Sequence, residues 1–143
     1  MNQSTAHAAY RSAEVETLSQ RELIVRLYQG AERFITAGRD AMVAHKGEEA
    51  MHQCRRARDI FVELMATLNF DAGGPLAKQL SDLYAFLIFQ ISEGSLKKNP
   101  AQLEALVPII RTLREGWEAV PDEHANVTSI PVGNRGHSLN LRC

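Results

Sequence analysis

The residues best suited to chemistry in this chain are Glu49 and His52, which stand three positions apart. The spacing Glu-x-x-His puts two ligands on one side of a helix, and dimetal four-helix bundles hold their ions with it. Such a centre needs two copies of the motif and two further inward glutamates, whereas this sequence has one copy. At about 100° per residue, both side chains also flank the apolar arc of their helix. The pair is therefore predicted to be solvated, and no metal site is expected.

Other reactive residue types give no better site. His45 faintly resembles the histidine of phosphotransfer bundles, but there the reactive histidine is expected in mid-helix, and His45 stands at a predicted helix end. Cys54 and Cys143 are far apart in the sequence, which predicts no disulfide framework and is typical of a reducing cytoplasm. The sequence has no glycine-rich phosphate loop, no Gly-x-Ser-x-Gly and no paired buried carboxylates. We therefore expect no enzyme, no cofactor and no small-molecule substrate.

Charge and hydropathy exclude two further classes of partner. Arg55, Arg56 and Arg58 form a basic cluster, but successive helical positions splay around the axis, and the net charge is −1. Nucleic-acid binding is not expected without a basic field or aromatic partners. The N-terminus lacks the charged start and apolar run of a signal peptide, and no stretch reaches the ~18 apolar residues of a membrane helix. A cytoplasmic protein without membrane insertion is expected.

Helical periodicity organises residues 18–120 into four segments. Ser19 and Glu22 fit a capping box, and the first helix is expected to end at Gly47, where glycine allows a left-handed turn. The second helix is expected over 48–68. Residues 69–75 read as a turn, with Pro75 as the first residue of a helix that runs to Lys98. Its inward face is predicted to hold Leu76, Leu80, Leu83, Tyr84, Leu87, Ile88 and Ile91.

The fourth helix is expected to begin at Asn99-Pro100 and to be interrupted. Pro108 lies two turns inside it, where a proline costs about 3 kcal/mol in a regular helix, so a kink or a break into two shorter helices is predicted. The expected fold is all-α, an antiparallel up-down-up-down four-helix bundle. Residues 1–17 form a short N-terminal segment, 18–120 the bundle, and 121–143 a flexible tail.

Several apolar residues fall outside the predicted core faces. Phe86 and Phe89 lie about 120° and 180° from the inward face of their helix and share one outward stripe. Val25, Val62 and Ile109 lie at or beyond the edges of their inward arcs. Apolar patches rimmed by charge often mark partner sites, but the N-terminal segment or the tail could also cover these rings.

Taken in order, several stretches resemble the FliS family of flagellin export chaperones. They are AY at 9–10, ETLSQRELIVRLYQGAERFI at 16–35, ARDIFVELMATLNFDAGGPLAKQLSDLYAF at 57–86 and LREGW at 113–117. The resemblance covers about residues 8–120. The chain departs from the family pattern at His7, Phe89 and Pro108.

The resemblance implies a cytoplasmic helical bundle that binds the C-terminal segment of flagellin. In the family this binding prevents premature polymerisation and serves delivery to the flagellar type III export gate. It implies a role for Tyr10, whose family equivalent folds over part of the client surface and contributes to docking at the export gate. The candidate flagellin-binding residues are Tyr10, Val25, Val62, Phe86, Phe89 and Ile109. The alternative is a generic helical adaptor or self-associating bundle with no flagellin client.

Overall fold

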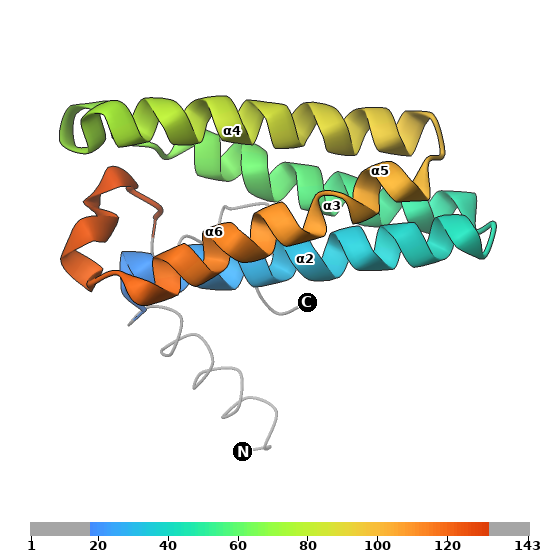
Figure 1. Cartoon of the computed structure of the whole chain (residues 1–143), viewed down its shortest axis with the longest axis horizontal. Coiled ribbons are helices and arrows are strands. Elements are labelled where there is room, and N and C mark those ends of the chain that lie inside the picture. The colour runs from blue at the N-terminus through green and yellow to red at the C-terminus, as the bar shows by residue number, and fades with distance from the viewer. Residues whose placement is uncertain (1–17, 132–143) are drawn as a thin grey trace, which may run out of the picture.

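The computed structural model describes residues 18–131, and these form five α-helices and one short 3-10 helix (Figure 1). The elements are α2 (Gln20–Val43), α3 (Gly47–Ala66), α4 (Phe70–Leu96), α5 (Pro100–Glu104), α6 (Val107–Ala119) and η1 (Asp122–Val127). The all-helical class predicted from the sequence is confirmed. Among the described residues, the one extended pairing recorded is an isolated bridge between Leu68 and Thr128.

Helix α2 starts as the sequence predicts and ends differently. The Ser19 side chain accepts a hydrogen bond from the backbone N–H of Glu22, 3.1 Å away, and so caps the helix. At the other end, the left-handed residue is His45 (φ 59°) and not the predicted Gly47, which instead begins α3. The N–H of Lys46 bonds the carbonyl of Ala41, which closes a Schellman motif around His45. Histidine is among the few non-glycine residues that adopt this conformation readily.

Helix α4 begins at Phe70, inside the segment 69–75 that the sequence predicts to be a turn. Asn69 caps it by accepting from the N–H of Ala72, so residues 70–73 are already helical. The predicted break is confined to Gly74 (φ 52°, ψ −132°), which directly precedes Pro75. A residue before proline is displaced from helical geometry, and glycine accepts the result without steric cost. Beyond this kink, Leu76 is 45% exposed, so its predicted inward position is wrong.

The predicted break in the last helix is confirmed. Helix α5 ends at Glu104 and α6 begins at Val107, with Asn99 capping the first piece by accepting from the N–H of Gln102. Pro108 therefore lies in the first turn of α6 rather than inside a long helix. At that position the missing N–H would have had no helical acceptor, so proline is tolerated.

The prediction of a flexible tail from Pro121 onward is wrong for residues 121–131. In η1 and the residues after it, Ala125, Val127 and Ile130 are buried. The N–H of Asn69 donates to the carbonyl of Val127 over 2.7 Å, and the N–H of Ser129 donates to Thr67 over 2.8 Å. These apolar residues do not recur at a helical period, so the sequence pattern that marks a core face does not detect them.

Helix α2 lies at the centre of the packing, against α3, α5, α6 and η1, while α4 packs on α3, α5 and η1. Figure 1 shows α2, α3, α4 and the α5–α6 pair lying lengthwise beside one another, with η1 at the end where α2 and α4 begin. The core contains a cluster of three rings, Tyr28, Phe61 and Tyr84, with centroids 5.9–6.5 Å apart. Because the interior is filled by these side chains, a partner can be bound only at the surface of the molecule.

Candidate functional site

Large apolar side chains remain exposed on the outer faces of α3 and α4. Phe86 is 45% exposed, Phe89 57% and Val62 44%, which confirms that these three point outward as the sequence predicts. Isolated exposed apolar residues are ordinary, but Phe86 and Phe89 are three positions apart on α4 and so lie on one side of it. Their grouping makes this surface a candidate contact site for another chain.

The other sequence-predicted site residues differ in their surroundings. Val25 on α2 and Ile109 on α6 are half-buried and pack against the core, so each presents only an edge to solvent. Tyr10 lies outside the described residues. The structure thus groups Phe86 and Phe89 on one helix but does not bring all six predicted residues into one exposed patch.

Polar side chains beside the two phenylalanines are held by neighbours within the chain. Lys78 pairs with Asp82 over 2.9 Å, and the Gln102 side chain donates to Gln90 and Glu93, each over 2.9 Å. Residues 121–131 pack at the far end of the molecule, so this part of the tail does not cover the rings. Among the described residues, the surface around Phe86 and Phe89 is therefore open, with a fixed polar border.

A hollow of about 1020 Å³ lies at the end of the molecule where α2 and α4 finish. Its walls come from the last turn of α2, the first three turns of α3 and the last turns of α4. Three exposed apolar side chains line it: Val43 is 63% exposed, Met51 55% and Leu96 83%. The buried side chains of Cys54 and Ile91 lie behind them. This hollow was not predicted from the sequence.

The hollow is bordered by two turns of the same construction. The α2–α3 turn has His45 in the left-handed region, and the α4–α5 turn has Lys98 there, with φ of 59° and 52°. In the second turn the N–H of Asn99 donates to the carbonyl of Gly94 over 2.9 Å, as Lys46 does to Ala41 in the first. Two Schellman motifs thus fix the backbone on either side of the hollow and set the positions of its basic residues.

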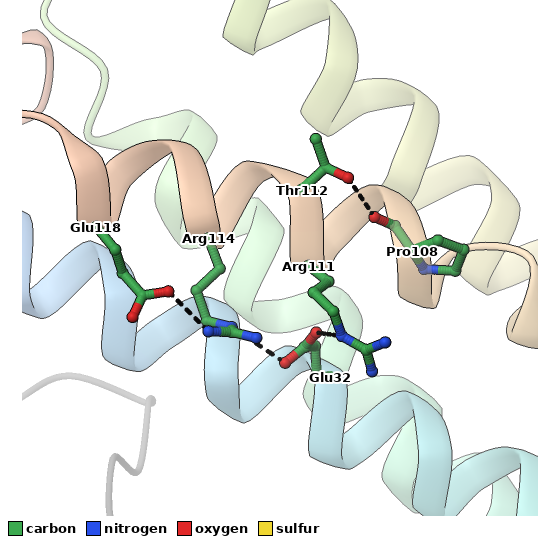
Figure 2. A network of polar contacts seen from close by, with 6 residues as sticks. All are labelled: Glu32, Pro108, Arg111, Thr112, Arg114 and Glu118. Atoms are coloured by element: carbon green, nitrogen blue, oxygen red, sulfur yellow. Dashed lines mark hydrogen bonds and ion pairs between the residues drawn. The ribbon is translucent and has the colours of Figure 1, made fainter.

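A charged network fixes α6 against α2, on another side of the molecule (Figure 2). Glu32 of α2 receives hydrogen bonds from Arg111 and Arg114 of α6, both over 3.3 Å, and Arg114 also pairs with Glu118 over 2.7 Å. The Glu32 side chain is only 16% exposed, so water screens this pairing less than it screens a surface ion pair. The network holds the half-buried edge of α6 in place.

A buried polar chain links three helices through the core. The hydroxyls of Tyr28 and Tyr84 lie 2.5 Å apart, and the Trp117 indole Nε1–H donates to the Tyr28 oxygen over 3.1 Å. Burial raises the pKa of Tyr28 to about 12 and that of Tyr84 well above 10.0, so both stay protonated at neutral pH. The chain is a structural link and leaves no ionised group in the interior.

Glu49, His52 and Cys54 do not form a metal site or a catalytic site in the described part of the chain. His52 and Glu49 are exposed, and Glu49 accepts a hydrogen bond from Gln53. No group of three or more potential ligands that could hold a metal ion occurs within residues 18–131. Burial raises the pKa of the Cys54 thiol, which disfavours the reactive thiolate. Over the same residues, no helix combines the length and the apolar character needed to cross a membrane.

Part of the hollow could have been found from the sequence. Met51, Arg55, Arg58 and Val62 recur at intervals of four, three and four residues, which marks one face of α3 beside its core face. Leu96 follows Phe89 by seven residues and so lies on the same side of α4, whereas Val43 is the last residue of α2. Only their convergence in space makes them part of one site.

Comparison with known proteins identifies the family. The family model described as "Flagellar protein FliS" matches residues 1–124. The flagellar secretion chaperone FliS of Vibrio cholerae is 31% identical over 133 residues, covering 87% of this chain and 95% of the relative. That of Campylobacter jejuni is 30% identical over 128 residues, covering 90% and 98%. These relatives are named as chaperones and not as enzymes. The chain therefore belongs to the FliS family of flagellar proteins.

Proposed function

We propose that this protein is a cytoplasmic chaperone that binds the C-terminal segment of flagellin, prevents its premature polymerisation and aids its delivery to the flagellar type III export gate. The observation that carries the proposal is the match to the FliS family over residues 1–124. It is supported by relatives named flagellar secretion chaperones that align over nearly their whole length. No catalytic step is part of this function.

The proposed framework is an antiparallel up-down-up-down four-helix bundle in which α5 and α6 together form the fourth arm. Short connections between α2, α3 and α4 and the packing of α5 and α6 on α2 support this arrangement. The core is then shared by all four arms, and client binding is left to the outer faces. A bundle of this kind presents grooves between neighbouring helices to a partner helix.

In this proposal the client covers Phe86, Phe89 and Val62. Their exposure of 44–57% means that each side chain can lose further apolar surface on binding, which contributes roughly 25 cal/mol per Å². The half-buried Val25 and Ile109 add edge contacts, and Tyr10 is proposed to fold over part of the client surface and to contribute at the export gate. The affinity is reduced by the cost of ordering a disordered client segment.

Calorimetric titration with the C-terminal segment of flagellin from the same organism tests the proposal. Saturable one-to-one binding with a negative heat-capacity change is expected, because apolar surface is buried. Absence of heat at several temperatures, together with separate elution of the two molecules on a sizing column, contradicts it. Self-association in the absence of client, measured by sedimentation equilibrium, would support the alternative of a helical adaptor without a flagellin client.

A further inference from the structure

Helices α2 and α4 both end on the right of Figure 1. The hollow between these ends combines an apolar lining with a positive border. Leu96, at 83% exposed, is the most exposed large apolar side chain among the described residues, and Val43 and Met51 stand beside the same space. Mutation of such an exposed side chain changes the stability of the free protein little. Its burial by a partner, in contrast, contributes favourably to the free energy of binding. Met51 adds a flexible side chain that adapts to irregular apolar surfaces.

The charge around the hollow has one predominant sign. Four permanently cationic side chains line it, Lys46, Arg55, Arg58 and Lys98, against the single carboxylate of Glu48. Arg58 forms an ion pair with Asp59 over 3.4 Å. Within residues 18–131, the structure gives Lys46, Arg55 and Lys98 no carboxylate partner. The protein as a whole carries a net charge of −1, so this cluster is a local excess of positive charge.

The shape of the hollow favours a peptide segment. Its α3 wall runs from Gly47 to Arg58, which is about 16 Å at 1.5 Å per residue and equals three turns of a partner helix. Its volume of about 1020 Å³ is at the upper limit of the roughly 300–1,000 Å³ typical of small-molecule sites. A site of this length with apolar contacts along one wall and charges on its border matches the way amphipathic helices are bound.

A second copy of this chain does not complement the hollow well. A two-fold symmetric contact places the same surface of both copies face to face, so the basic border of one copy would face the basic border of the other. Like charges brought together in this way oppose association. The favoured occupant therefore carries carboxylates next to its apolar side chains.

We propose that this hollow anchors an acidic amphipathic segment of the client, with bulky apolar side chains on Val43, Met51 and Leu96 and carboxylates paired with Lys46, Arg55 and Lys98. This inference rests on the proposed function and adds to it a second contact, at the end of the molecule beyond the surface around Phe86 and Phe89. The basic border also steers the client towards the hollow and fixes the direction in which the segment lies.

Two variants of the full chain test the inference by titration with the C-terminal flagellin segment. Leu96→Asp is expected to raise the Kd by at least about tenfold, the effect of losing a hot-spot contact. The double variant Arg55→Glu/Lys98→Glu is expected to raise the Kd and to weaken its dependence on NaCl concentration, because fewer ion pairs are left to screen. The matched control is Leu76→Asp, which places the same charge on an exposed leucine near the start of α4.

The outcomes separate this inference from the proposed function. If the wild-type protein binds and both hollow variants stay within twofold of its Kd, the inference is overturned and the proposed function stands. If the wild-type protein does not bind, both fail. If Leu96→Asp instead dissolves a dimer that sedimentation detects in the wild type, the hollow is an interface between copies and the inference is likewise overturned. Circular dichroism and urea unfolding confirm that each variant remains folded.

Discussion

The hydroxyl oxygens of Tyr28 on α2 and Tyr84 on α4 lie 2.5 Å apart in the core, and Trp117 of α6 donates to the Tyr28 oxygen. One buried hydroxyl thus joins three helices that are distant in sequence. An intact chain of this kind contributes modestly to stability, but a broken one leaves buried polar groups without partners. The structure therefore predicts a marked difference between the two tyrosines.

Tyr28→Phe is expected to lower the free energy of unfolding by about 2–4 kcal/mol, because it leaves both the Trp117 N–H and the Tyr84 hydroxyl without partners. Tyr84→Phe removes the Tyr84 hydroxyl but leaves the hydrogen bond from Trp117 to Tyr28. The free energy of unfolding is therefore expected to fall by only about 1 kcal/mol. Urea unfolding followed by circular dichroism measures both. Equal losses in the two variants would contradict the central position of Tyr28.

The same pair predicts alkaline destabilisation. Burial raises the pKa of Tyr28 from 10.0 to about 12 and that of Tyr84 well above 10.0. The folded state thus holds these protons more tightly than the unfolded state, so the stabilisation is complete below pH 10.0 and is lost as the pH rises towards 12.

For each such tyrosine the free energy of unfolding is expected to fall by about 1.4 kcal/mol per pH unit in that window. Urea midpoints measured from about pH 9 to about pH 11 test this, with the Tyr28→Phe/Tyr84→Phe double variant as the control. The double variant is expected to lose stability less steeply. Parallel slopes in the two proteins would show that other groups cause the loss.

Gly73→Ala is expected to disturb the packing of η1. A Cβ at this position would lie 2.4 Å from a methyl carbon of Val127 and 2.9 Å from the Cβ of Ala77. Such overpacking costs about 1–3 kcal/mol. Gly116→Ala is the matched control, since nothing lies within 4 Å of its Cβ, and removing a helical glycine is expected to stabilise by about 0.5–1 kcal/mol.

Combining Gly73→Ala with Val127→Ala makes room for the new methyl group. The double variant is therefore expected to lose at least about 0.5 kcal/mol less than the sum of the two single losses. Thermal unfolding of the wild type and the three variants gives this coupling. If the two single losses simply add, the start of α4 at Gly73 and Val127 of η1 are not in steric contact.

Phe86→Asp is expected to raise the Kd for the flagellin segment by at least about tenfold while changing the free energy of unfolding by no more than about 0.5 kcal/mol. The ring is 45% exposed, so a carboxylate there remains solvated in the free protein but is desolvated in the complex. Phe70→Asp is the control, since Phe70 is 52% exposed at the other end of α4. Loss of helicity in Phe86→Asp would place the ring in the core instead.

The parts of the fold that follow from local signals are those the sequence predicts well. Ser19 and Asn99 cap helices because their side chains replace backbone acceptors within three residues, and Pro108 breaks a helix through its own ring. The outward positions of Val62, Phe86 and Phe89 follow from the 3.6-residue period of helices that run without interruption through them. Leu76 shares that period with Leu80 but stands in the first turn after Gly74, and a periodic pattern does not say whether a neighbouring element covers the end of a helix.

By itself, therefore, the sequence determined the helical class, most helix starts, the last helix break and the family to which the chain belongs. Only the tertiary structure decided that His45 makes the left-handed turn, that Val127 and Ile130 complete the core, and that Val43, Met51 and Leu96 meet in one basic-rimmed hollow. The physical reason is that caps and periods act over a few residues. Burial and the convergence of side chains depend instead on which elements become neighbours in space.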